Sequence, residues 1–231
     1  MIPARRGDVT AIPVNDRRLT LEDIEDLRSY ERDRIAYRKK IIELKRRRRV
    51  AVGPLVTLLF ENRETIRFQV QEMVRVEKML LDEQVQDELD IYNPLIPAPG
   101  ELSATLFIEL TSEAALRQWL AKLVGIERSL ELRLSSSGGD AEGTSGGAVA
   151  GSSGGGGGGV VRSVPETAHE EALTRETVTP SVHYVKFVLT PEQVLRFATG
   201  PVTLAVAHRA YKEARSLSEE TRAELLTDLR P

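Results

Sequence analysis

The sequence contains no cysteine. This absence excludes disulfide frameworks, thiolate catalysis, zinc sites built from thiolates and cysteine-held iron–sulfur clusters. Any metal would therefore need histidine and carboxylate ligands, and the chain has only three histidines. No cofactor is required by the sequence.

Long apolar runs and familiar catalytic motifs are also missing. No segment approaches the roughly 18 apolar residues of a membrane span, and the basic start of the chain precedes no apolar signal region. We therefore expect a cytoplasmic protein without membrane association. The sequence has no Gly-x-Ser-x-Gly elbow, His-Glu-x-x-His helix, Walker loop or dinucleotide-binding glycine pattern, which disfavours the familiar hydrolases, kinases and dehydrogenases.

What is present is the composition of a globular protein interrupted by a glycine-rich stretch. Of 231 residues, 41% are apolar and 29% charged, which is enough for an ordinary core. Residues 135–180 include the run 154–159 of glycines and many serines, which predicts a disordered insert. We expect a flexible tail over 1–19, and a core made of 20–134 and 181–231.

Hydrophobic periodicity and turn residues predict alternating helices and strands. Helices are expected from the capping-box pattern at Thr20 to about Arg49, from about 61 to 90, from 111 or 112 to 124, from 190 to 199 and from 210 to 229. Strands are expected over 50–60 with a Gly53-Pro54 interruption, 102–110, 129–134, 182–189 and 202–208. The strand over 102–110 alternates in the manner of a half-buried strand. These elements predict an α+β fold, with an approximately five-stranded mixed or antiparallel sheet covered by helices on one side.

Three ionisable residues occupy positions that helix and strand geometry assign to apolar faces. On a helical wheel, Glu77 lies inside the apolar arc of its helix, while His183 and His208 share strand faces with aliphatic residues. If the fold brings these three side chains together, they would form a divalent-metal site or an acid/base centre. Glu101 or Glu109 could add an oxygen, and Tyr92, Tyr184 or Tyr211 a proton donor. The alternative is that each is an individually satisfied core residue, so whether the protein is an enzyme stays open.

A basic run ends the first predicted helix. Residues 28–49 contain eleven lysines and arginines against three acids, a local net charge of +8, with its peak at Lys45, Arg46, Arg47, Arg48 and Arg49. Such a cluster can bind nucleic acid by releasing counterions from phosphates. We favour the alternative that these arginines pair with the protein's own carboxylates, because no stacking aromatics accompany them.

Two motifs, together with shorter stretches near them, resemble one bacterial family. The first motif covers Phe60 to Met73, with the sequence FENRETIRFQVQEM. The second covers Tyr92 to Pro97 and continues at Gly100 to Leu106. They resemble the family catalogued as domain of unknown function 3501. The run 44–50 and the stretch from His183 to Phe187 resemble the same family's pattern.

The resemblance implies a role but no established activity. The family's genes are associated with those of rubrerythrin-like di-iron proteins and iron–sulfur oxidoreductases, which implies an accessory role in redox or peroxide-stress chemistry. Our leading hypothesis is a docking protein for such a partner. Its binding residues would be Glu61, Asn62, Arg63, Gln69, Glu72, Tyr92, Asn93 and Glu101.

Overall fold

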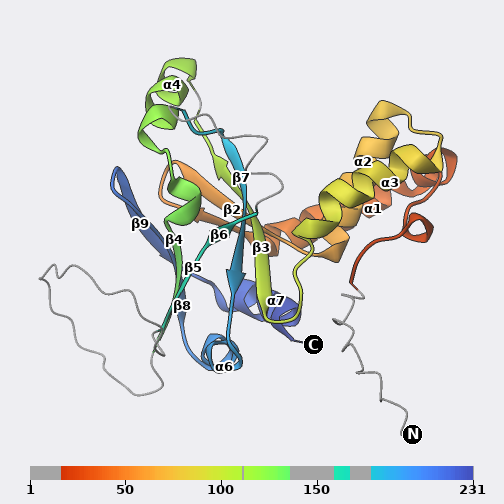
Figure 1. Cartoon of the computed structure of the whole chain (residues 1–231). Coiled ribbons are helices and arrows are strands. Elements are labelled where there is room, and N and C mark those ends of the chain that lie inside the picture. The colour runs from red at the N-terminus through yellow and green to blue at the C-terminus, as the bar shows by residue number, and fades with distance from the viewer. Residues whose placement is uncertain (1–16, 111, 136–158, 167–177, 231) are drawn as a thin grey trace, which may run out of the picture.

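The computed structural model describes residues 17–110, 112–135, 159–166 and 178–230. These residues form two antiparallel sheets and a unit of three helices that projects from one side of them (Figure 1). The predicted α+β class is confirmed, and so is a five-stranded antiparallel sheet. The sequence analysis did not predict the second sheet.

The five-stranded sheet has the order β1-β2-β3-β7-β6. Its strands are β1 (Arg49–Val52), β2 (Val56–Glu61), β3 (Glu101–Ile108), β7 (Val182–Val188) and β6 (Val164–Pro165). The register pairs Leu59 with Thr105 and Thr105 with Tyr184. Because side chains alternate between faces, Glu61 on β2 shares the outer face with these residues.

The second sheet has the order β5-β4-β8-β9. Its strands are β5 (Val160–Arg162), β4 (Leu130–Leu134), β8 (Val202–His208) and β9 (Tyr211–Ser216). The helix predicted from Ala210 is wrong up to Ser216, because this segment turns back and pairs along its whole length with β8. The strands β5 and β6 lie within the insert predicted over 135–180. The rest of that insert, 136–158 and 167–177, lies outside the described residues, as do 1–16 of the predicted tail.

The main core lies between the two sheets. The inward residues of β2, β3 and β7 and those of β4 and β8 belong to one apolar cluster, including Leu58, Leu106, Phe187, Leu132 and Leu204. These positions follow the two-residue alternation of the strands. The alternation expected over 102–110, and the strand faces shared by His183 and His208, agree with these core-facing positions, whereas the second sheet was not expected.

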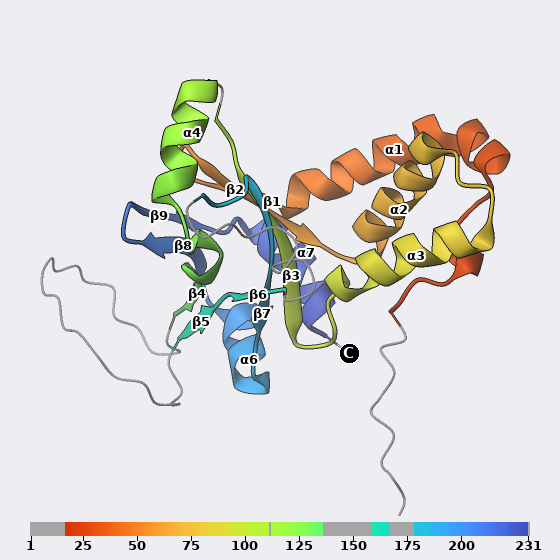
Figure 2. The same cartoon turned by 45° about the horizontal axis from the view of Figure 1, so that its top comes forward.

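The helical unit consists of α1 (Leu27–Arg48), α2 (Arg63–Glu77) and α3 (Asp82–Tyr92) (Figure 2). Thr20 caps only a short 3-10 turn, η1 (Leu21–Asp23), and α1 begins after Asp26, whose side chain accepts hydrogen bonds from two backbone amides. The single helix predicted over about 61–90 is divided at Lys78, which has a left-handed backbone. The segment predicted as one interrupted strand over 50–60 is the β1–β2 hairpin, with Gly53 at positive φ in its turn.

Five further helical segments complete the described structure. They are η2 (Asn93–Leu95), α4 (Glu113–Lys122), η3 (Ile126–Arg128), α6 (Pro191–Thr199) and α7 (Glu219–Leu229). The half-buried strand predicted over 102–110 is buried on both faces in its middle, because residues of the helical unit lie over Thr105. Within the described part of the chain, no helix combines the length and apolar character needed to cross a bilayer.

Candidate functional site

A cavity of about 190 Å³ lies between the outer face of the five-stranded sheet and the helical unit. Strand residues Glu61, Thr105 and Tyr184 line it from the sheet. Helix residues Gln69 and Tyr92 line it from the opposite side. The cavity is completed by Lys45, Leu59, Thr65, Ile66, Leu95, Phe107 and Val182. Its volume corresponds to about six water molecules at roughly 30 Å³ each, so it admits a small ligand only.

Glu61 is the acidic group of this cavity. It ends β2, is only 6% exposed and accepts a hydrogen bond of 2.7 Å at Oε1 from the hydroxyl of Thr105. No other hydrogen bond or ion pair to this carboxylate is made by the described residues. The second oxygen, Oε2, is therefore available to a donor that enters the cavity. Such a donor would be stabilised there, because a buried charge is costly in free energy unless it is hydrogen-bonded or paired.

Two tyrosines supply hydroxyl groups to the same cavity. Burial raises the pKa of Tyr92, and a hydrogen bond with Gln69 opposes that rise. Burial also raises the pKa of Tyr184, and the nearby Tyr92 and Glu61 raise it further. Both hydroxyls therefore stay protonated at neutral pH. The cavity thus combines one acidic residue, Glu61, with two neutral phenols and one basic residue, Lys45.

Glu72 belongs instead to an ion-pair cluster between α1 and α2. Arg34 donates to both carboxylate oxygens, at 2.8 and 2.9 Å, and the hydroxyl of Tyr30 donates at 2.6 Å. Arg75 adds a hydrogen bond of 3.3 Å. The bond with Arg34 lowers the pKa of Glu72 to about 2 against the opposing effect of burial. These contacts join the two helices.

The other predicted binding residues hold turns and chain ends together. Asn62 caps α2 by accepting from the amide of Thr65. Arg63 forms an ion pair of 2.6 Å with Asp23. Asn93 exchanges two hydrogen bonds with the backbone of Leu19, which belongs to the predicted tail and is buried. Glu101 accepts from the amide of Ala98. Of the predicted binding set, Glu61, Gln69 and Tyr92 are the residues that line the cavity.

Glu77, His183 and His208 are not brought together as a metal site. Among the described residues, no group of three or more histidines, aspartates or glutamates could hold a metal ion. Glu77 is exposed, so the expectation that it lies in a buried stripe is wrong. The helical wheel assumed a continuous helix, whereas α2 ends at Glu77 and the chain turns away at Lys78.

The two histidines are buried as predicted, but each has its own nearby partners. The Nδ1 atom of His208 accepts from the amide of Ala210, and its Nε2 atom lies 3.1 Å from the carbonyl oxygen of Val124. His183 Nε2 lies 2.9 Å from the hydroxyl of Thr179, and His183 Nδ1 lies 3.8 Å from a carboxylate oxygen of Glu127. These contacts match the alternative of individually satisfied core residues. A catalytic role for Glu77, His183 and His208 stays a prediction.

Glu109 and Tyr211, which were also considered for that centre, have partners elsewhere. Glu109 accepts from the hydroxyl of Thr57 at 2.6 Å and pairs with Arg49. The Tyr211 hydroxyl donates to the carbonyl of Val52 at 2.6 Å, on the β1–β2 hairpin.

The basic run is neutralised largely by α7. Arg48 is fully buried, donates to the carbonyl oxygens of Phe60 and Glu61, and pairs with Asp228. Ion pairs also join Arg46 to Glu220, Arg47 and Arg48 to Glu224, and Arg49 to Glu109. Lys45 lies over the ring of Phe68. This arrangement matches the interpretation that the arginines pair with the protein's own carboxylates.

Comparisons with known proteins identify relatives of unknown function. The model of the family described as "Protein of unknown function (DUF3501)" matches residues 18–145 and 158–229. The comparison with curated proteins gave no match. A crystal structure of a novel protein of unknown function from Burkholderia pseudomallei is 32% identical, with a TM-score of 0.74. The similarity covers 91% of this chain and 98% of that one. The chain therefore belongs to the DUF3501 family of proteins of unknown function.

Proposed function

We propose that this protein is an accessory protein that binds a small hydrogen-bond donor, such as a protonated amine, in the cavity beside Glu61. The observation that supports this proposal is the buried carboxylate of Glu61, which receives a single hydrogen bond from the described residues. An ammonium group would supply the missing donor and the compensating charge. The hydroxyl of Tyr92 would bond a polar atom elsewhere on the ligand.

The experiment is a thermal-shift screen of the purified protein against ammonium, methylammonium, ethanolamine and putrescine salts. A ligand that binds only the folded state raises Tm, and the rise grows with the logarithm of the ratio of ligand concentration to Kd. We expect at least one amine to raise the Tm of the wild type and not that of the Glu61→Gln variant. The matched control is Glu109→Gln, because Glu109 also accepts a threonine hydroxyl on the same sheet but does not line the cavity. Equal shifts in all three proteins, or none in the wild type, would contradict the proposal.

We further propose that the protein docks onto a cytoplasmic redox partner, a proposal that rests only on the gene association that the family resemblance implies. Its test is affinity capture from cells treated with peroxide, followed by mass spectrometry of the retained proteins. We expect a rubrerythrin-like or iron–sulfur oxidoreductase to be enriched over capture with an unrelated bait. Failure to recover any oxidoreductase would remove the redox part while leaving ligand binding in the cavity to be judged by the thermal shifts.

A further inference from the structure

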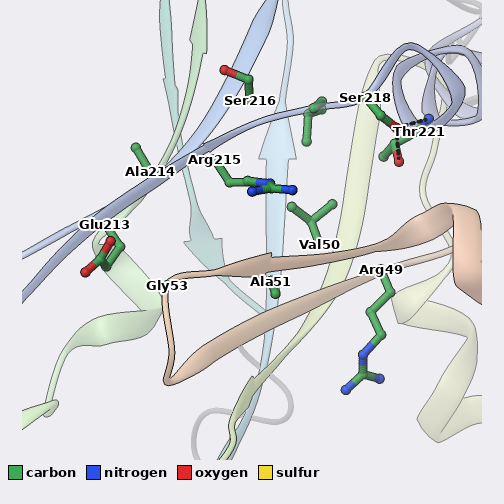
Figure 3. Close-up of a pocket in the computed structure, with 11 residues that line it drawn as sticks. Arg49, Val50, Ala51, Gly53, Glu213, Ala214, Arg215, Ser216, Ser218 and Thr221 are labelled. Carbon is green, nitrogen blue, oxygen red and sulfur yellow. Dashed lines mark hydrogen bonds between the residues drawn. The ribbon is translucent and has the colours of Figure 1, made fainter.

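A groove of about 840 Å³ runs between β1 and β9, each of which is the edge strand of its sheet (Figure 3). The two strands meet at one end, where the Tyr211 hydroxyl donates to the carbonyl of Val52. At the other end the groove is bordered by Arg49 on β1 and by Ser218 and Thr221 at the start of α7. It is separate from the cavity beside Glu61.

The edge of β9 presents unpaired backbone groups along this groove. The amide of Leu217 donates to the carbonyl of Val202, so these two residues form a hydrogen-bonded pair between β9 and β8. In an antiparallel pair of strands, every second residue pair is hydrogen-bonded in this way. Arg215, Glu213 and Tyr211 therefore direct their backbone groups toward β8. Those of Lys212, Ala214 and Ser216 point away from it. Within the described chain, no backbone hydrogen bond uses these outward groups.

The edge of β1 has the same character. The amide of Glu109 donates to the carbonyl of Leu55. Because the backbone groups of successive residues point alternately to the two neighbouring strands, those of Thr57 and Leu59 also bond to β3. The residues between them bond to β1. It follows that Val50 and Val52 bond to β2, while the backbone groups of Arg49 and Ala51 point outward. Both sheets thus leave open edges along one groove.

The strand β9 carries a small net positive charge, from Lys212 and Arg215 against Glu213. Figure 3 shows the guanidinium of Arg215 in the space between β9 and Val50 of β1. Among the described residues, Arg215 and Lys212 make no ion pair, and they lie on opposite faces of β9. Arg49, in contrast, already pairs with Glu109. Glu213 packs where the strands meet, since its side chain would touch any β-carbon added at Gly53.

We propose that this groove binds an extended, acidic segment of a partner protein as an additional strand on β9. An exposed strand edge supplies main-chain hydrogen bonds to an incoming strand, and side-chain contacts select its sequence. Acidic residues at alternate positions of the segment would share one face of the added strand, where they would meet Arg215. This surface goes beyond the proposed function, because it needs no ligand in the cavity.

The test is fluorescence anisotropy with a short labelled peptide of alternating glutamate and valine, at about 50 mM salt where exposed charges are weakly screened. We expect saturable binding to the wild type, and affinity at least about tenfold lower for Arg215→Glu, because the reversed charge repels the peptide. Arg209→Glu is the matched control, since Arg209 is exposed in the β8–β9 turn and does not line the groove. Its affinity should equal that of the wild type.

A second peptide distinguishes strand addition from attraction between charges alone. A peptide strand has two edges, and N-methylation of alternate residues removes the main-chain donors of one edge while keeping every charge. Two methylated peptides are made, one for each edge, and the peptide methylated on the edge that faces β9 should no longer bind. The proposal would be overturned if the peptide did not bind the wild type, or if the Arg215→Glu and Arg209→Glu variants bound it with equal affinity. It would also be overturned if both methylated peptides bound as tightly as the unmethylated one. Tighter binding of a lysine–valine peptide would overturn the acidic specificity. Self-association of the protein through β9, measured by light scattering and abolished by Arg215→Glu, would also overturn the proposal of a partner segment.

Discussion

At the scale of single residues, the carboxylates of the family motif differ in what surrounds them. Glu72 receives two hydrogen bonds from Arg34 and one from Tyr30, whereas Glu61 receives one from Thr105. Both are glutamates near an apolar interior, and sequence spacing does not separate them. Their partners come from distant positions in the chain, which explains why one holds helices together and the other faces a cavity.

Glu72→Gln should reduce the free energy of unfolding by about 2 kcal/mol at neutral pH, because an ion pair and charge-assisted hydrogen bonds are lost. The pKa of Glu72 lies near 2, below its ordinary value of 4.5. Its stabilisation is therefore complete above about pH 5 and disappears as the pH falls toward 2. Urea denaturation across this range should show the difference between wild type and variant shrinking. Glu31→Gln, at an exposed position on α1, is the control, and a pH-independent difference for Glu72→Gln would contradict the assignment.

At the scale of elements, backbone conformation at a few positions determined where helices and strands end. Lys78 divides the two helices predicted as one, and Gly53 converts one predicted strand into a hairpin. Both have positive φ, a conformation that glycine adopts freely and other residues adopt at a cost. The sequence marked Gly53 as an interruption, but no glycine or proline marked Lys78.

Gly53→Ala should destabilise the protein more than Gly125→Ala does. Both glycines have positive φ, so each substitution should cost about 1 kcal/mol for the backbone alone. A β-carbon at Gly53 would also clash with the Tyr211 hydroxyl oxygen and with Cγ of Glu213, whereas nothing lies within 4 Å at Gly125. Chemical denaturation of the two variants measures the difference. Equal losses would show that β1 and β9 do not meet closely at the hairpin turn.

At the scale of the whole molecule, the buried Arg48 joins parts that are far apart in sequence. It ends α1, bonds the backbone at the end of β2, and pairs with Asp228 and Glu224 of α7. Burial raises the pKa of Asp228, and the charge of Arg48 opposes that rise. The helical unit, the five-stranded sheet and the last helix therefore meet at one guanidinium.

Arg48→Ala should cost about 3–5 kcal/mol of unfolding free energy, because it leaves Asp228 buried without its counter-charge. Arg46→Ala is the matched control from the same basic run. Its side chain is 62% exposed, and a surface pair of this kind contributes at most about 1 kcal/mol. Urea denaturation followed by circular dichroism would measure both losses. Similar small losses for the two variants would mean that Arg48 does not hold these elements together.

The sequence by itself determined the α+β class, most strands, the inward-facing positions on those strands and the family. These follow from two-residue alternation and from contiguous motifs, both of which are local in the chain. It also placed His183 and His208 in the interior, because their strands are regular. Glu77 was misplaced because the helix on which its position was projected ends at that residue.

The tertiary structure decided what local patterns could not express. The second sheet depends on Tyr211–Ser216 pairing with β8, a choice made by burial and hydrogen bonding across the sheet and not by the helical propensity of the segment. The cavity depends on α2 and α3 lying over β2, β3 and β7, which brings Glu61, Tyr92 and Tyr184 together from three separate parts of the chain. Such contacts arise when distant apolar surfaces are buried against each other, and so the site exists only in the folded molecule.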